Sequence, residues 1–493
     1  MAQTDRMNRI LIGILALFAG LVMISCEKES SHLVMPQRPQ VGAGPEGDPD
    51  YEYYRYSSEG KLRDSVYFYT YYFYLWQDQL PWSFPTHNYW TAEGVLNALK
   101  SYARNPMGQP IDRYSFLDRE GTINQEIQQG YTGSFGFDIR YYTEEALYIK
   151  LVDEGSPAYN AGLRRGWQLT EVNGRRDLSM ASMEQDDFEF LFRALYDAPS
   201  LQLKARNPAG QELSFTLQKA VYNIRPILAH RIFDAGGEKV GYFALNMFLT
   251  NALIRSQLDN IMGQFSAAGV KKLIVDLRYN GGGDVATANY ISNLLAPASA
   301  NHQLMNQYVI NNTLSSEGWG FFIFYPEYFN KTNSLDPERV YFLVTNGTAS
   351  ASELLINNLN PYMDVKLIGD GKTFGKPVGY FGWDIMGVDL YAVSFQTLNA
   401  NNYGDFYDGM PVDQFARDGL NKDFGDPQEE MTAQALYHVQ HGAFPAAGGA
   451  GLDMSTSARI RTRDNPDMNK RLDQRSPKAM FDFRKVKKEK KDE

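Results

Sequence analysis

The stretch from Tyr341 to Leu355, YFLVTNGTASASELL, constrains the fold more than any other part of the chain. It begins with four apolar residues typical of a buried strand, turns at Asn346-Gly347, and continues into a helix that we expect from Ser350 to Asn360. The free amides and the dipole at a helix N-terminus favour negative charge. A serine at such a strand-to-helix turn is therefore placed where a nucleophile and an oxyanion could lie.

Strands and helices alternate on both sides of this stretch. Apolar runs predict buried strands, and amphipathic runs predict helices, at 240–245, 272–277, 284–295, 340–344, 350–360 and 365–368. This alternation is typical of an α/β layered core, which we place at residues 223–440. With 493 residues, the chain has room for two or three domains, so we expect an α+β or α/β multidomain protein.

Composition excludes several kinds of site. The net charge of −10 argues against general nucleic-acid binding, because phosphate neutralisation needs a basic surface. The single cysteine, Cys26, allows no intramolecular disulfide and no thiolate metal site, and the six histidines show no metal-ligand spacing. We expect no metal and no cofactor.

The first residues resemble a bacterial lipoprotein signal peptide, which we place at 1–26. Arg6 and Arg9 precede an apolar run that is too short to span a membrane comfortably, and Cys26 stands where the lipidated residue would be. The alternative is an ordinary signal peptide with an incidental cysteine. Residues 27–50 contain four prolines and predict a flexible tether. From the signal and Cys26 we expect a lipid-anchored protein of the bacterial envelope, facing the periplasm or the cell surface.

Residues 51–130 predict a helical region. Leu62–Gln79 is dense in Tyr, Phe and Trp with no Gly or Pro, and a second helix is expected over Ala92–Tyr102. We interpret the aromatic side chains as core packing.

Residues 131–222 change to short strands, at 133–139 and 146–152, separated by Gly-rich turns. This part resembles a PDZ domain of the bacterial protease type. In such a domain a glycine-flanked loop offers backbone N–H groups to a peptide carboxylate, and the neighbouring strand edge accepts an added strand. The resemblance implies that Phe135, Gly136 and Phe137 form the carboxylate-binding loop; the alternative is a small sandwich that only packs against its neighbour.

Four separated motifs then occur in order: Gly241-Tyr242, DLRYNGGG at 276–283, TASASE at 348–353 and TFGK at 373–376. Together they resemble the C-terminal processing, or tail-specific, serine peptidases over roughly residues 60–435. The resemblance implies a PDZ domain before a crotonase-like α/β core, with a serine and a lysine as catalytic residues. It also implies protein or peptide substrates bound by their C-terminal segments.

The resemblance implies that Ser350 is the nucleophile and Lys376 the general base. Ser352 competes with Ser350 on local grounds, but two positions apart on a helix the side chains point in different directions. Lys372 lies outside the TFGK pattern. The resemblance also implies that the backbone N–H groups of Gly282 and Ala351 form the oxyanion hole.

The proposed chemistry requires a neutral lysine. A lysine with its ordinary pKa of about 10.4 is charged at neutral pH and cannot accept the serine proton, so it must be buried in apolar surroundings, to which we expect Phe374 to contribute. Some relatives have a Gln four residues after the lysine, where this chain has Tyr380. Either the tyrosine hydroxyl replaces that Gln or the site is a plain dyad. A Ser-His-Asp arrangement is not expected, since no histidine lies near either motif in sequence, and its candidates in the core would be His230 and His302.

Residues 441–493 are Gly- and Ala-rich and then charged, with a basic run from Arg484 to Lys491, and predict a disordered tail. The function that the sequence supports best is that of an endopeptidase of the bacterial envelope. Two alternatives stay open: a binding lipoprotein that captures peptides or ligands without cutting, and a structural partner in an envelope complex. In either case Ser350 would serve only as a helix N-cap. The oligomeric state cannot be predicted.

Overall fold

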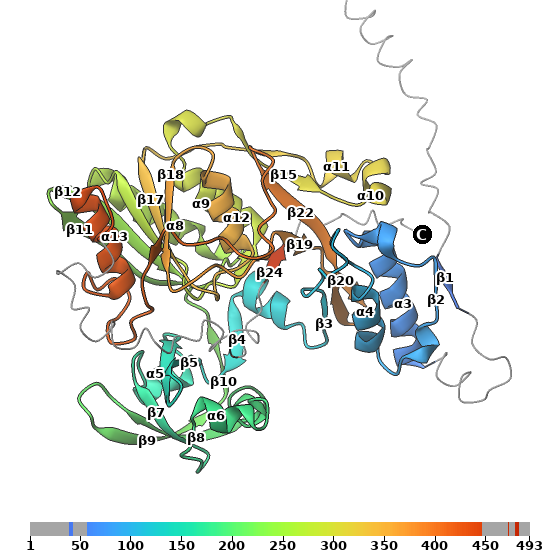
Figure 1. The fold of residues 1–493 in the computed structure, drawn as a ribbon, viewed down its shortest axis with the longest axis horizontal. Coiled ribbons are helices and arrows are strands. Elements are labelled where there is room, and N and C mark those ends of the chain that lie inside the picture. Colours follow the sequence, from blue (N-terminus) through green and yellow to red (C-terminus); the bar gives the residue numbers. More distant parts are fainter. Residues whose placement is uncertain (1–38, 43–56, 446–471, 473–478, 483–493) are drawn as a thin grey trace, which may run out of the picture.

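The computed structural model describes residues 39–42, 57–445, 472 and 479–482. It shows a mixed α/β protein of several parts: an N-terminal helical part, a β-rich module and a large core (Figure 1). The predicted signal peptide and Cys26 lie outside the described residues. Among the residues described, none belongs to a helix both long and apolar enough to cross a membrane.

The core is built on a six-stranded sheet that contains the four strands predicted from apolar runs. Its order is β11-β12-β13-β17-β18-β23, and every neighbouring pair is parallel except β11 with β12. The strands are β11 (Ile227–Ala235), β12 (Glu238–Leu245), β13 (Lys272–Asp276), β17 (Arg339–Val344), β18 (Asp364–Gly369) and β23 (Gln414–Phe415).

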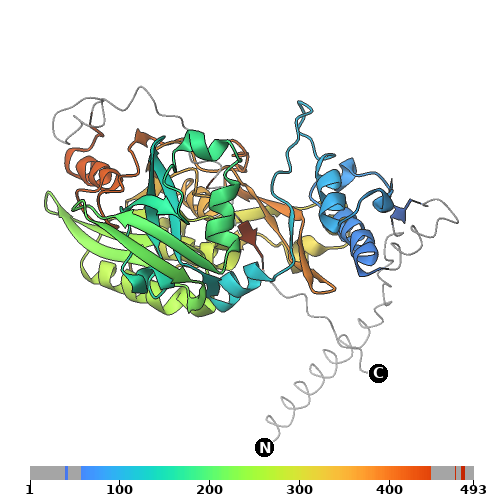
Figure 2. The same ribbon diagram turned by 90° about the horizontal axis from the view of Figure 1, so that it is seen from below.

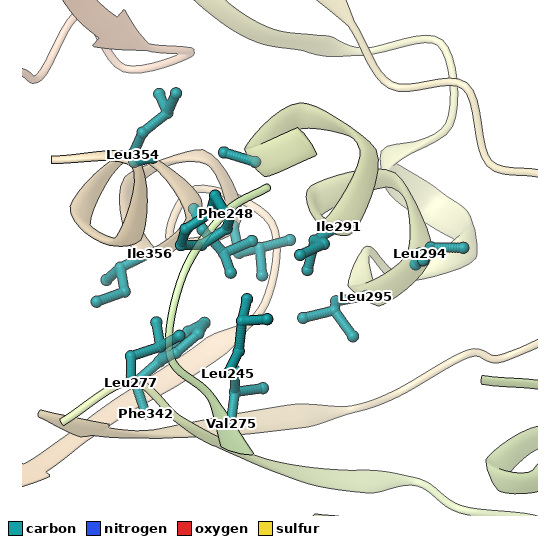
Figure 3. Close-up of a cluster of buried hydrophobic side chains, with 14 of the residues drawn as sticks. Leu245, Phe248, Val275, Leu277, Ile291, Leu294, Leu295, Phe342, Leu354 and Ile356 are labelled. Carbon is teal, nitrogen blue, oxygen red and sulfur yellow. The ribbon is translucent and has the colours of Figure 1, made fainter. Parts of the chain in front are cut away.

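Helices cover both faces of this sheet, which explains why its strands are apolar throughout. The alternating residues Val275 and Phe342 pack under helices α8 (Asn251–Ala267), α9 (Val285–Leu295) and α12 (Ala351–Leu359), as Figure 3 shows in part. The intervening residues Ile274 and Tyr341 face helix α13 (Glu430–His441). Burial on two sides holds β17 and α12, and hence the turn between them, in place.

A second six-stranded sheet has the order β14-β24-β19-β22-β15-β16. Its strands are β14 (Gly282–Asp284), β24 (Ala479–Phe481), β19 (Val378–Tyr380), β22 (Val393–Asn399), β15 (Leu304–Val309) and β16 (Glu327–Tyr328). The short helices α10 (Asn312–Ser316) and α11 (Trp319–Phe322) follow β15.

Strand β24 corrects the prediction of a disordered tail over 441–493. Residues 479–481 pair with β14 as a strand, residues 480–482 are buried in the core, and Leu472 is buried as well. The prediction was wrong here because it weighed the charge of the whole segment. The apolar pair Met480 and Phe481 is enough to bury a short strand where a sheet offers open edges.

The β-rich module contains an antiparallel sheet in the order β5-β6-β7-β8-β9, seen in front of the core in Figure 2. Its elements are β5 (Phe137–Thr143), β6 (Ala146–Val152), β7 (Gln168–Val172), β8 (Ser200–Arg206), β9 (Glu212–Gln218), α5 (Pro157–Ala161), α6 (Met180–Glu184) and α7 (Glu189–Phe192). The antiparallel pair β4 (Tyr131–Ser134) and β10 (Ala220–Asn223) brings together the two ends of the module.

The N-terminal part packs against the second sheet of the core. The stretch Leu62–Gln79 predicted a buried helix that ends near Pro81, but helix α3 (Ser58–Phe73) ends earlier. The Leu75 N–H donates to Val393 O of β22, which draws the chain toward the sheet. Helix α4 (Ala92–Lys100) matches its prediction within two residues. A hairpin of β20 (Trp383–Ile385) and β21 (Val388–Tyr391) pairs with β3 (Phe116–Asp118).

The predicted tether 27–50 is also partly structured. Residues Gln40–Val41 form strand β1, which pairs in parallel with β2, Ser83–Phe84. Composition alone missed this pairing because a strand of two residues carries no periodic signal.

Candidate active site

Ser350 lies at the turn between strand β17 and helix α12, as the opening stretch predicts. Its φ of 63° and ψ of −111° are in a region that L-residues rarely adopt, which points the residue away from the regular helix path. The side chain is fully buried, and its Oγ has no hydrogen-bond partner among the described residues. Ser352, by contrast, donates from its Oγ to Asn280 O at 3.0 Å. The structure therefore leaves the hydroxyl of Ser350, and not that of Ser352, uncommitted.

Lys376 follows β18 in the chain and is also fully buried. Its Nζ lies 3.9 Å from the ring centroid of Tyr380 and 5.8 Å from that of Tyr114, and it finds no hydrogen-bond partner in the described part of the chain. Burial lowers the pKa of Lys376 well below its ordinary value, and the nearby Glu353 and Asp112 oppose this shift. Lys372 is exposed.

The carboxylate of Glu353 connects the serine turn to the lysine loop. One oxygen, Oε2, accepts the backbone N–H of Ser350 and that of Lys376, each at 2.8 Å. The other, Oε1, accepts from Gly375 N at 2.7 Å and from the Thr373 hydroxyl. Burial raises the pKa of Glu353 above its ordinary value, whereas these donors favour its ionised form.

Sequence reasoning quoted Glu353 within the TASASE motif but gave it no role. A signal was available, since a Ser followed three residues later by Glu is the pattern of a capping box at a helix start. The contacts with residues 373–376, however, depend on the fold and could not be predicted from that pattern.

The two predicted oxyanion donors differ in the structure. Ala351 is the first residue of α12, where backbone N–H groups lack partners within the helix. Gly282 N already donates to Asn280 Oδ1 at 2.9 Å, and Asn280 Nδ2 in turn donates to Leu245 O. The Gly282 N–H is thus occupied, and an oxyanion could use it only if the Asn280 side chain shared or released it.

Tyr380 resolves the question of the missing Gln. Its hydroxyl donates to Tyr114 O at 2.6 Å, while the face of its ring covers the Lys376 amine. The alternative in which the tyrosine hydroxyl replaces the Gln as a partner of the lysine is therefore wrong for this conformation. The rings of Tyr380 and Tyr114, with the half-buried Phe374 beside Tyr114, form the dry wall that was expected from Phe374.

Tyr114 reaches the lysine loop from the N-terminal part. Its hydroxyl donates to Gly375 O at 2.6 Å, and the neighbouring Arg113 donates to Phe374 O at 3.0 Å. No sequence motif indicated this contact. The candidate histidines His230 and His302 are both exposed, so neither faces the buried Ser350. A further histidine of the core, His438 on α13, is buried, and its Nδ1 lies 2.8 Å from the Tyr341 hydroxyl oxygen. Within the described ranges, no group of three or more His, Cys, Asp or Glu could hold a metal ion.

A comparison with known proteins matches part of this sequence to a family. Residues 239–399 match the sequence model of peptidase family S41. The chain carries an S41 peptidase domain. This confirms the resemblance to C-terminal processing serine peptidases, because the S41 domain contains all of the predicted site residues of the core.

The curated proteins that are similar in sequence include proteases named for carboxyl-terminal processing. The chain is 28% identical over 274 residues to a carboxyl-terminal-processing protease of Synechocystis, covering 55% of this chain and 58% of the relative. It is 22% identical over 290 residues to the carboxy-terminal processing protease CtpA of Bacillus subtilis, covering 57% and 55%. The chain thus spans a little over half the length of these curated relatives. A Bacteroides fragilis crystal structure assigned to the S41 proteases shares the fold, with a TM-score of 0.59, 24% identity, and coverage of 77% of this chain and 97% of that one.

A buried ion cluster lies at the DLR motif of the S41 domain. Arg278 binds Asp276 at 2.8 Å, Asp418 at 3.0 Å and Glu429 at 2.8 Å, all fully or almost fully buried. Arg165 of the β-rich module joins the same Asp418 at 2.9 Å. The surrounding arginines hold the pKa of Asp418 well below its ordinary value despite its burial. Through Asp418, the DLR motif of the core is thus linked to Arg165 of the module.

The predicted carboxylate loop lies in the β-rich module, outside the S41 match. Gly136 has a φ of 78°, and a Cβ there would come 2.0 Å from Ser156 Cβ, so only glycine fits. Gly136 N donates to Ser134 Oγ, and Phe135, which is buried, accepts at its carbonyl from Ala158 N. Phe137 begins β5, the end strand of its sheet, whose outer edge no described strand occupies.

Proposed function

We propose that the protein is a serine endopeptidase that cleaves protein or peptide substrates through an acyl-enzyme on Ser350, with Lys376 as general base. The observation that carries the proposal is the arrangement around Glu353. One carboxylate oxygen binds the backbone of Ser350, a serine at positive φ, and the backbone of Lys376, whose buried amine has a lowered pKa. An uncharged amine beside a hydroxyl at a helix start is what this chemistry needs.

The reaction follows from these groups. Neutral Lys376 Nζ accepts the Ser350 hydroxyl proton as Oγ bonds to the substrate carbonyl carbon, and the resulting ammonium donates that proton to the leaving amine. The tetrahedral oxyanion is stabilised by the Ala351 N–H and, once Asn280 yields it, by that of Gly282. Water, deprotonated by the same amine, then hydrolyses the ester. Since Oγ and Nζ do not hydrogen-bond to each other here, the two groups must come within hydrogen-bond distance before the first step.

The β-rich module fits the role of a PDZ-like domain that binds C-terminal segments of substrates. The open edge of β5 can accept a peptide as an added strand, and the loop 135–137 stands at the start of that edge. The lipoprotein signal at 1–26 supports a lipid-anchored location in the bacterial envelope, where such an enzyme would meet exported proteins. The core would then be the crotonase-like peptidase domain.

The test combines activity with labelling. Ser350→Ala and Lys376→Ala should each abolish digestion of casein, an unstructured protein, while circular dichroism and melting show an intact fold. A fluorophosphonate should add to Ser350 of the wild-type protein, as read by peptide mass spectrometry. The exposed Lys372→Ala is the matched control and should digest casein at the wild-type rate. Normal turnover by either active-site variant would refute the proposal.

One observation favours the second candidate, a peptide-binding lipoprotein without catalysis. Ser350 and Lys376 are both fully buried, and the Gly282 N–H is occupied. If the wild-type protein neither digests casein nor takes up the fluorophosphonate, but binds peptides, this binding function replaces the peptidase.

A further inference from the structure

A strand from the C-terminal tail lies between the two strands that flank the candidate site. Strand β24 pairs in parallel with β14, with Gly282 opposite Ala479 and Asp284 opposite Phe481. On its other side it pairs in parallel with β19, where Phe481 lies opposite Tyr380. β14 begins at the predicted oxyanion residue Gly282, and β19 follows the lysine loop. The tail thus fills the gap between the oxyanion strand and the strand next to the base.

The tail strand is closely packed against the core. Met480 and Phe481 are fully buried, and the ring of Phe481 lies 5.6 Å from that of Tyr380 and 5.0 Å from that of Tyr391. The Asp482 N–H donates to Tyr380 O at 3.1 Å. At Gly379 a Cβ would come 2.8 Å from Met480 O, so the absence of a side chain there lets the tail backbone approach.

The tail strand lies far along the sequence from the last helix of the core. The last helix of the core, α13, ends at His441, and β24 begins at Ala479. Between them, Leu472 packs into the hydrophobic cluster of the β-rich module. A strand separated by that many residues from the rest of the core can be treated as a tethered ligand, for which a strand from another chain can compete.

The same region is closed to solvent. Ser350 and Lys376 are fully buried, so no polypeptide could reach the hydroxyl in this arrangement. Extended peptides bind proteins by adding a strand to an open sheet edge, and the gap between β14 and β19 offers two such edges.

We propose that the gap between β14 and β19 is a binding site for an extended polypeptide segment, and that residues 479–482 occupy it as an intramolecular blocking strand. This proposal rests on the proposed function, because the segment that competes with the tail would be the polypeptide substrate of the peptidase. Apolar residues at the two positions of Met480 and Phe481 would be preferred in that ligand. Displacing the tail opens the site, and the docked tail holds the enzyme inactive.

The first test releases the tail in the full chain. Met480→Asn with Phe481→Asn removes the buried apolar contacts, whereas Met107→Asn with Phe321→Asn makes the same exchanges at side chains that are 80% and 85% exposed. The tail variant should digest casein about tenfold faster than the wild type or more, and the control should not change. Unchanged or slower digestion by a tail variant that melts like the wild type would overturn the proposal. So would failure of the tail variant to fold, since β24 would then be an obligatory strand.

The second test does not need catalysis. In the Ser350→Ala background, a fluorescent peptide of residues 475–486 should bind the protein that carries the Met480→Asn and Phe481→Asn exchanges, as measured by anisotropy. It should bind the Ser350→Ala protein with an unchanged tail more weakly. A scrambled peptide is the control. Absence of binding would overturn the strand site whether or not the protein is a peptidase. Binding without casein digestion by any variant would keep the strand site and refute only the peptidase function.

Discussion

At the scale of single residues, Ser350 adopts a strained backbone conformation. A non-glycine residue at a φ of 63° typically costs about 1–3 kcal/mol, and it persists because neighbouring bonds, such as that from Ser350 N to Glu353, hold it. The strained conformation sets the direction in which the Ser350 side chain leaves the backbone at the strand-to-helix turn. The strain is thus part of how the turn presents its hydroxyl.

This strain can be measured by removing it. Both Ser350→Ala and Ser350→Gly lose the hydroxyl and should be inactive, but glycine accepts positive φ without the Cβ penalty. We expect the glycine variant to unfold in urea with a free energy about 1 kcal/mol higher than that of the alanine variant. A glycine variant that is less stable than the alanine variant would show that the turn is not strained.

Burial of the Lys376 amine lowers the stability of the folded protein at neutral pH. Because burial lowers its pKa in the folded state, unfolding takes up a proton at neutral pH. The stability linked to this group is fully present above the unfolded pKa of about 10.4 and is lost as pH falls toward the lower folded value. The buried amine therefore destabilises the protein at the pH at which it would act.

Lys376→Met should abolish turnover and yet raise the melting temperature by a few degrees at neutral pH. The difference from the wild type should shrink as pH rises from about 7 toward 10, since deprotonation of the unfolded lysine removes the cost. Thermal melts of the variant and the wild type over this pH range measure this difference. Lys372→Met, at an exposed position, should show neither effect, and an equal gain there would contradict the explanation.

At the scale of elements, the site depends on how helix α12 is held against the loop 373–376. Glu353 accepts only N–H and O–H donors from both sides, namely Ser350 N, Thr373 Oγ1, Gly375 N and Lys376 N. No other side chain among the described residues joins these two segments so directly. A carboxylate suits this place because it accepts on both oxygens and donates on neither.

Glu353→Gln tests that requirement with almost no change of shape. The amide NH₂ would face donors, so at least one buried N–H would lose its acceptor, at a cost of about 1–3 kcal/mol. We expect a lower melting temperature and a casein digestion rate at least roughly tenfold lower, because the serine and lysine backbones are no longer held together. Glu212→Gln on the exposed strand β9 is the control; equal behaviour of the two variants would contradict the role.

At the scale of the whole molecule, the β-rich module and the core share a buried charge. Asp418 of the core binds Arg165 of the module at 2.9 Å and Arg140 of the module at 3.6 Å, besides Arg278 of the core. Because its pKa is held low in the folded state, its stabilising contribution is present above about pH 4 and is lost only as pH falls further, through the folded value.

Asp418→Asn should destabilise the protein by about 3 kcal/mol or more, because it leaves buried arginines without their counter-charge. We also expect faster trypsin cleavage between the module and the core. Melting and limited proteolysis at neutral pH check both. Asp234→Asn on an exposed ion pair with Lys239 should change neither, and a loss of stability there as large as in Asp418→Asn would argue against a special role for burial.

The sequence by itself determined the parts of this protein whose signals are local. Apolar runs placed the four parallel strands, because burial on both faces leaves strands apolar throughout. The turn at Asn346-Gly347 and the helix start after it were predicted from adjacent residues, whereas the TASASE and TFGK motifs indicated Ser350 and Lys376 only through the resemblance to the C-terminal processing peptidases.

Only the tertiary structure decided what surrounds those two side chains. The ring of Tyr114 reaches the lysine from more than two hundred residues earlier in the chain, and Tyr380 turns its ring, not its hydroxyl, toward the amine. The tail strand at 479–481 enters a sheet whose other strands lie far upstream. Such contacts depend on which edges and cavities the packed core leaves open, and no local pattern of residues records them.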